Sequence, residues 1–120
     1  MEKKHKIVVA DDNINIRQNW LDILTDKGYQ VSTVKDGYEL LNYLRKESPE
    51  IIILDMIMPD KDGIEIFSSI KSIVPSSKII IYTGFERYEH SVYAGIADKF
   101  LLKSDNPEIL LKEIEGLLEK

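Results

Sequence analysis

Five polar side chains stand directly after runs of apolar residues, where the strands of a sheet would end: Asp11, Asp12, Asp55, Thr83 and Lys103. Three carboxylates that meet at one sheet edge repel one another, which raises a pKa or requires a cation. Carboxylate oxygens without His or Cys suit Mg²⁺ far better than zinc. A carboxylate nucleophile, a magnesium ion, a hydroxyl and a lysine together make a pocket that forms an acyl phosphate.

Taken singly, most of these residues have a plainer explanation. Asp11 and Asp12 are also typical N-cap residues of a following helix, and for the pair alone this explanation is as strong as a metal site. Thr83 would satisfy a turn, and Lys103 would be a solvated surface lysine. Asp55 differs, because it follows a buried strand and has no helix start to cap. The coincidence of five such positions at one edge favours the phosphoryl pocket.

The runs that carry these residues alternate with helical patterns along the whole chain. Apolar runs predict strands over 6–10, 29–34, 51–54, 78–82 and 99–102. Between them we expect a helix closed by Gly28, helices over about 36–46, 62–75 and 86–96, and a last helix that begins at 106–108 with the inner stripe Ile109, Leu110, Ile114, Leu117 and Leu118. Short connections of this kind predict right-handed crossovers and a parallel sheet with helices on both faces.

The strands differ in how deeply they are buried. Strands 6–10, 51–54 and 78–82 show no polar alternation, which is typical of central strands, whereas 29–34 alternates as an edge strand does. With strands two and five at the edges, the order is 2-1-3-4-5. Ligand sites of such sheets form where the order reverses, here between strands one and three. We therefore expect one doubly wound α/β domain over residues 1–120, with five strands and five helices.

Composition excludes several classes of function. The chain carries 16 Lys plus Arg against 21 Asp plus Glu, and its basic residues form no stripe, which argues against direct nucleic acid binding. It has no cysteine, so disulfides and thiolate sites are excluded. No apolar run is long enough for a membrane span or a secretion signal, and we expect a cytoplasmic protein.

Four segments carry a family resemblance: VVADDN at 8–13, IILDMIMPDKDG at 52–63, YTG at 82–84 and FLLK at 100–103. On these motifs the sequence resembles the receiver domains of bacterial two-component response regulators, which have the CheY-like, flavodoxin-like fold. The resemblance covers essentially the whole chain, and the joint match is highly specific.

The resemblance implies roles for individual residues. Asp55 would accept phosphate from the phosphohistidine of a sensor histidine kinase or a histidine phosphotransfer protein. Asp11, Asp12 and Asp55 would hold Mg²⁺ together with a main-chain carbonyl at Met56 or Ile57, for which we take Ile57. Such a receiver promotes its own phosphorylation and dephosphorylation but is not a turnover enzyme.

The resemblance also implies a switch. Thr83 and Lys103 would contact the phosphoryl oxygens, and Phe100 stands where the family has an aromatic residue that rotates as the hydroxyl moves. An ordinary core aromatic explains Phe100 equally well. The partners on the helix 4, strand 5 and helix 5 face would be a downstream effector or a fused output domain, and a dimer formed on phosphorylation stays open. One departure is Ser104, because the family has proline after the lysine, often with a cis peptide bond that is costly without proline.

Two other functions are weighed against this one. A phosphatase with an aspartate nucleophile, of the haloacid dehalogenase type, needs an acidic residue two places after Asp55, where this chain has Ile57. The second alternative is a receiver-like interaction module that no longer takes phosphate. Retention of all five pocket residues argues against that module.

Overall fold

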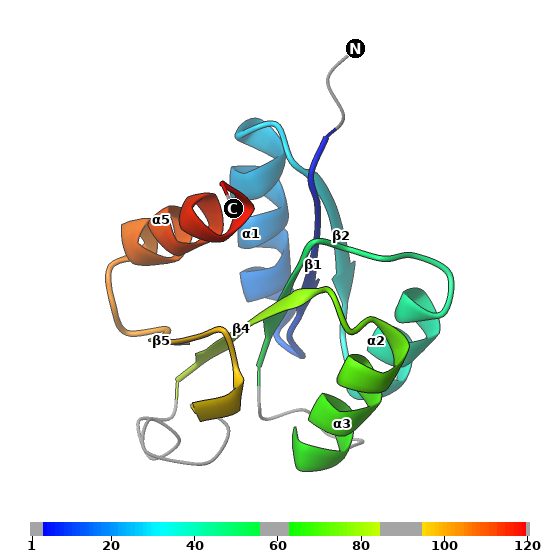
Figure 1. Cartoon of the computed structure of the whole chain (residues 1–120). Coiled ribbons are helices and arrows are strands. Elements are labelled where there is room, and N and C mark those ends of the chain that lie inside the picture. The colour runs from blue at the N-terminus through cyan, green and yellow to red at the C-terminus, as the bar shows by residue number, and fades with distance from the viewer. Residues whose placement is uncertain (1–3, 56–62, 85–94, 120) are drawn as a thin grey trace.

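A parallel sheet of five strands forms the centre of the structure (Figure 1). The computed structural model describes residues 4–55, 63–84 and 95–119. Its strands are β1 (Lys6–Ala10), β2 (Gln30–Val34), β3 (Ile51–Leu54), β4 (Lys78–Thr83) and β5 (Lys99–Leu102). The helices within the described residues are α1 (Ile14–Asp26), α2 (Gly37–Leu44), α3 (Gly63–Ile73) and α5 (Pro107–Leu118). The strand order β2-β1-β3-β4-β5 confirms the prediction.

The register of the central strands decides what lies at the carboxyl edge of the sheet. β1 pairs with β3 so that Ala10 lies opposite Leu54, the last residue of each strand. The next residues, Asp11 and Asp55, therefore leave the sheet side by side. Both strands are buried along their length apart from Lys6, as their lack of polar alternation predicts.

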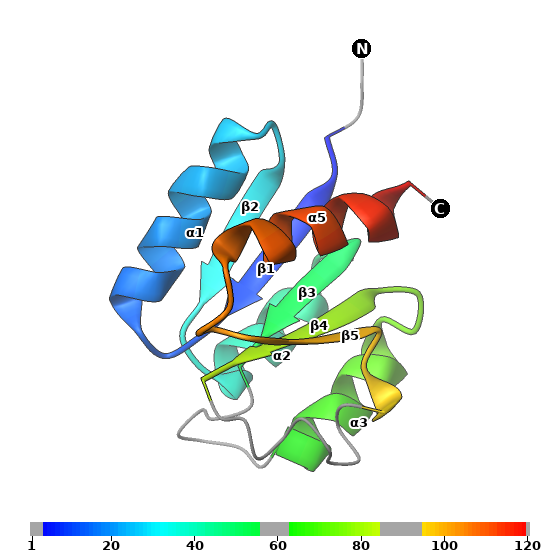
Figure 2. The same ribbon diagram turned by 90° about the vertical axis from the view of Figure 1, so that its left-hand side faces the viewer.

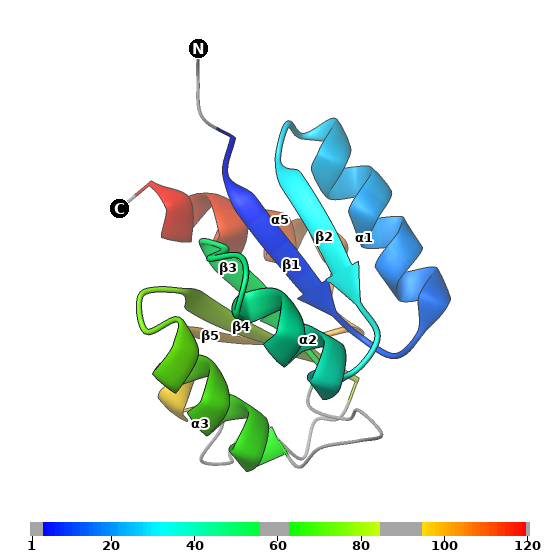
Figure 3. The same cartoon turned by 90° about the vertical axis from the view of Figure 1, so that its right-hand side faces the viewer.

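Helices cover both faces of the sheet and divide the core into two clusters. The face under α1 and α5 includes Ile7, Val9, Ile53, Ile80 and Tyr82 (Figure 2). The face under α2 and α3 includes Val8, Ala10, Ile52, Leu54, Ile79 and Ile81 (Figure 3). On the first face the rings of Trp20 and Tyr82 meet edge to face, with centroids 5.8 Å apart and planes at 86°.

Three helices begin with a side-chain cap just beyond the carboxyl end of a strand. The caps are Asn13 for α1, Asp36 for α2 and Asn106 for α5, and each side-chain oxygen accepts a main-chain N–H of the first turn. Asp36 accepts the N–H of Glu39, and the side chain of Glu39 accepts the N–H of Lys35, the residue before the cap, so the two carboxylates satisfy main-chain donors on both sides of the helix start. These caps fix the loops that surround the candidate site.

The helices differ from the sequence prediction at one residue, and one predicted helix lies largely outside the described residues. The sequence predicts Ile109 on the inner stripe of the last helix, and this is wrong, because the residue is 40% exposed. The helix predicted over 86–96 falls largely outside the described residues. None of the helices in the described part of the chain is long and apolar enough to cross a membrane.

Asp98 joins β5 to the start of β4 and offers a test of the sheet. Its main-chain N–H donates to the carbonyl of Ile79 at 2.9 Å, and its Oδ2 accepts the N–H of Ile79 at 2.7 Å. In Asp98→Ala the buried N–H of Ile79 loses its acceptor, so we expect the free energy of unfolding to fall by about 1–3 kcal/mol in urea titrations. Asp98→Asn keeps an acceptor oxygen and should lose less.

Asp22→Ala is the matched control, since it removes the same charge from an exposed position on α1. Equal losses of stability in Asp98→Ala and Asp22→Ala would contradict the assigned role of Asp98.

Candidate metal and phosphoryl site

Three neighbouring strands end in polar residues at the carboxyl edge of the sheet. Asp11 follows β1, Asp55 follows β3 and Thr83 ends β4, and all three are buried, with exposed fractions of 2%, 6% and 0%. Main-chain bonds extend the sheet into this edge: the N–H of Asp55 donates to the carbonyl of Ala10, and the N–H of Lys103 to that of Thr83. The sheet itself therefore holds the site together.

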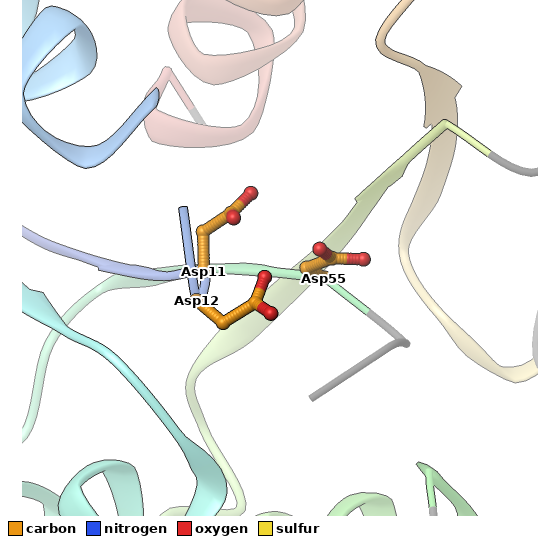
Figure 4. A group of neighbouring side chains, drawn as sticks. All are labelled: Asp11, Asp12 and Asp55. Carbon is orange, nitrogen blue, oxygen red and sulfur yellow. The ribbon is translucent and has the colours of Figure 1, made fainter. Parts of the chain in front are cut away.

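Three carboxylates converge at this edge. One oxygen from each of Asp11, Asp12 and Asp55 lies within 4.8 Å of the other two. Figure 4 shows the carboxylate of Asp12, the exposed member, turned toward Asp55. An all-oxygen donor set fits a hard divalent cation such as Mg²⁺. The three carboxylates that the sequence predicts as magnesium ligands thus lie close together, and their role as ligands stays a prediction.

Lys103 lies against two of these carboxylates. Its Nζ is 2.6 Å from Asp11 Oδ2 and 3.1 Å from Asp55 Oδ2. Burial of the ammonium lowers its pKa, but the hydrogen bond to Asp11 and the negative charges of Asp55 and Asp11 outweigh that cost, so the pKa of Lys103 is raised above its ordinary value. Lys103 is therefore an ammonium at neutral pH and the counter-ion of the buried pair.

The loop between β1 and α1 removes one of the alternatives. The cap of α1 is Asn13, whose Oδ1 accepts the N–H groups of Asn15 and Ile16. Asp11 instead accepts the N–H of Asn13 at 2.9 Å and faces Lys103. The N-cap explanation for Asp11 and Asp12 is thus wrong.

Sequence reasoning missed Arg17, whose Nη1 donates to the main-chain carbonyl of Asp11 at 2.8 Å. The spacing of the sequence does indicate that the Arg17 side chain reaches this loop. Residues four apart share a helix face, and helical side chains lean toward the N-terminus, so a long cation four residues after the cap Asn13 lies above the loop that precedes the helix.

The remaining predicted residues have different outcomes. Phe100 is half-buried and packs against the cluster under α2 and α3, so its role as a switch stays a prediction. Ile57 lies outside the described residues. No cis peptide bond occurs among the described residues, so Lys103 and Ser104 are joined by a trans bond.

Comparison with known sequences agrees with this geometry. The family model described as the response regulator receiver domain matches residues 7–115. Sporulation initiation phosphotransferase F of Bacillus subtilis is 35% identical over 107 residues, covering 87% of this chain and 86% of that protein. Response regulator MprA of Mycolicibacterium vanbaalenii is 30% identical over 118 residues, 96% of this chain. The chain spans about half, 51%, of the length of MprA.

Solved structures show the same fold. Response regulator TrrA of Thermotoga maritima, crystallised in complex with Mg²⁺-BeF, superposes with a TM-score of 0.86 at 30% identity, covering 94% of this chain and 98% of that one. A second structure of TrrA, in complex with the histidine kinase ThkA, gives a TM-score of 0.85 at 31% identity, with coverage of 95% and 98%.

The raised pKa of Lys103 predicts that the stability of the fold depends on pH. Because its pKa is higher in the folded chain, the ammonium stabilises the fold fully below the ordinary lysine value of about 10.4, and this contribution is lost as the pH rises through the folded value. In urea titrations without divalent cations, we expect Lys103→Met to lower the free energy of unfolding by about 2 kcal/mol at pH 8. The difference from the unchanged chain should shrink above about pH 10.5.

Lys112→Met, at an exposed lysine of α5, controls for the loss of charge. A deficit of Lys103→Met that matches this control, or that grows with pH, would refute the role of Lys103 as counter-ion.

Proposed function

The chain belongs to the response regulator receiver domain family, and on that premise we propose that Asp55 accepts a phosphoryl group from a phosphohistidine. The donor is a sensor histidine kinase or a histidine phosphotransfer protein. One observation carries the proposal: an oxygen from each of Asp11, Asp12 and Asp55 lies within 4.8 Å of the others. Such a cluster at a buried sheet edge supplies both a nucleophile and the ligands of a divalent cation.

The chemistry follows from these positions. One carboxylate oxygen of Asp55 attacks phosphorus while the bond between phosphorus and the imidazole nitrogen breaks, and the electron pair returns to the ring. The products are an acyl phosphate on Asp55 and a neutral imidazole, whose other nitrogen keeps the proton. Asp11, Asp12, Asp55 and the carbonyl of Ile57 would hold Mg²⁺, which when bound supplies positive charge to the phosphoryl oxygens.

The charges of the site support a divalent ion. The carboxylates of Asp11, Asp12 and Asp55 face the single ammonium of Lys103, which leaves two negative charges uncompensated among these groups. An anionic phosphoryl group cannot approach this edge unless positive charge is added. The ammonium of Lys103, already 3.1 Å from Asp55 Oδ2, is placed to contact the transferred group.

The consequences of transfer would travel through β4 and β5. Thr83 ends β4, and Ile81, two residues earlier on the same strand, pairs with Phe100 of β5. The hydroxyl of Thr83 would bind a phosphoryl oxygen, and Phe100 would repack as β4 shifts. The face formed by β5, α5 and the helix predicted over 86–96 would then present a changed surface to an effector or a fused output domain, or to a second phosphorylated copy.

The proposal gives the chain a signalling role in the cytoplasm rather than catalytic turnover, since each molecule takes one phosphoryl group. It would only promote the gain and loss of its own phosphate. A longer parent protein with an output domain is compatible with the partial coverage of MprA.

The first test is intact mass after incubation with a small acyl-phosphate donor and Mg²⁺. We expect a single phosphoryl adduct that is absent from Asp55→Asn, absent with a chelator and retained in Asp22→Asn, an exposed aspartate of α1. No adduct from a folded, magnesium-loaded chain, with either the small donor or a phosphorylated histidine protein, would overturn the proposal and favour the phosphate-independent module.

The rim of the site supports a protein donor. Ile14, the first residue of α1, is 66% exposed, and Ile109, in the first turn of α5, is 40% exposed. Both helices begin at the edge where Asp55 lies (Figure 2). Because Asp55 is only 6% exposed, a protein that delivers an imidazole to it must cover this rim. The donor would thus bury apolar side chains around the pocket.

We expect Ile14→Ser to slow phosphoryl transfer from a phosphorylated histidine protein by at least about tenfold at limiting donor, because burial of an isoleucine contributes about 1.5–3 kcal/mol. Transfer from the small donor should be unchanged. Ile96→Ser is the control, since Ile96 is also exposed but precedes β5 at the opposite edge of the sheet. Equal slowing with both donors, or in both variants, would contradict a donor surface at Ile14.

A further inference from the structure

The main-chain carbonyl of Asp11 is held by a side chain that lies outside the carboxylate cluster. Asp11 uses every polar group it has: its N–H donates to the carbonyl of Val34, Oδ1 accepts from Asn13, Oδ2 faces Lys103, and the carbonyl accepts from Arg17 Nη1 at 2.8 Å. The first three bonds fix the strand end and the side chain. The bond from Arg17 acts on the peptide group between Asp11 and Asp12.

That peptide group decides where Asp12 lies. The carbonyl of Asp11 and the N–H of Asp12 belong to one rigid plane, so a bond to the carbonyl fixes the orientation of both. On its other side Asp12 adjoins Asn13, the N-cap residue of α1, whose side chain accepts the N–H groups of Asn15 and Ile16. Asp12 is itself exposed, and its carboxylate turns toward Asp55 (Figure 4). The main chain of Asp12, and with it the direction of its Cα–Cβ bond, is therefore held from the two flanking residues.

Arg17 is well placed to act as a clamp. Its main-chain N–H donates to the carbonyl of Asn13 in the first turn of α1, and the residue as a whole is half-buried. The side chain thus extends from a rigid helix back to the loop, and groups placed on rigid elements hold a site more accurately than loop residues do.

We propose that Arg17 is a positioning residue of the metal site, which directs the Asp12 carboxylate toward Asp11 and Asp55 and so favours Mg²⁺ over larger cations. The inference rests on the proposed function, because it assumes that these carboxylates bind a divalent ion. Mg²⁺ demands a nearly ideal octahedron with short bonds of about 2.1 Å, whereas Ca²⁺ accepts longer and more variable geometry. Looser positioning of Asp12 should therefore weaken the binding of Mg²⁺ more than the binding of Ca²⁺.

Charge and position predict opposite effects of removing Arg17. The guanidinium is a positive charge near a cation site, so its loss should strengthen cation binding if charge alone matters. If Arg17 positions Asp12, its loss should weaken binding, since residues that orient metal ligands typically contribute about 10- to 100-fold in affinity. The sign of the change separates the two explanations.

The experiment measures dissociation constants for Mg²⁺ and Ca²⁺ by calorimetry on the whole chain, beside thermal unfolding. Arg17→Met removes the donor and keeps the unbranched stem, Arg17→Lys keeps the charge and one donor, and Arg45→Met is the control. Arg45 lies at the end of α2, is exposed and donates to Asn42. The Arg45→Met substitution therefore removes the same positive charge at a position far from the carboxylate cluster.

We expect Arg17→Met to weaken Mg²⁺ binding by about tenfold and Ca²⁺ binding by less than about threefold, with Arg17→Lys between it and the unchanged chain. Arg45→Met should bind both ions as the unchanged chain does. Unchanged or tighter Mg²⁺ binding in Arg17→Met overturns the inference. Equal weakening of both ions also overturns it, because that result indicates general loosening. If the unchanged chain binds neither ion, the proposed function fails with it.

Discussion

The repulsion among three carboxylates at one sheet edge is the constraint on which the rest of this structure depends. Asp11 and Asp55 are almost fully buried, and burial of like charges is tolerated only where counter-charge is fixed nearby. Lys103 supplies that charge, and it does so from the far edge strand. Its position follows from the pairing of β5 with β4, where Thr83 lies opposite Leu102. The short β5 strand thus serves the charge balance of the pocket as well as the sheet.

The alternation of side chains along the strands assigns the site residues to two faces. Asp11 and Asp55 continue the rows of Ile7 and Ile53 under α1 and α5, whereas Thr83 continues the row of Ile79 and Ile81 under α2 and α3. Phe100 packs in that second cluster. Asp55 therefore continues the row on one face of the sheet, and Thr83 and Phe100 belong to the other, so the proposed contact between a phosphoryl group on Asp55 and the hydroxyl of Thr83 would couple the two layers.

Much of this arrangement could be predicted from the sequence because it follows from local rules. Uninterrupted apolar runs identify the central strands, and the residues after them identify the site, as Asp55 does after Leu54. Ile109 could not be placed, because adjacent helix residues point about 100° apart and spacing alone does not say that Leu110 rather than Ile109 faces the sheet. The position of Arg17, four residues after Asn13, indicates that its side chain reaches the loop before α1, but the sequence does not say that it binds the carbonyl of Asp11.

The pocket also shows how such a fold separates stability from function. An apolar residue in place of a buried carboxylate is often neutral or stabilising when the whole charged group is replaced, so stability alone gives no reason to keep Asp11 and Asp55. Their backbone bonds do not need carboxylates either, since the N–H of Asp55 and the carbonyl of Ala10 would pair with any side chain. What the carboxylates add is a local excess of negative charge beside one ammonium, which a divalent cation can neutralise. The site is therefore better explained by what it binds than by what it contributes to folding.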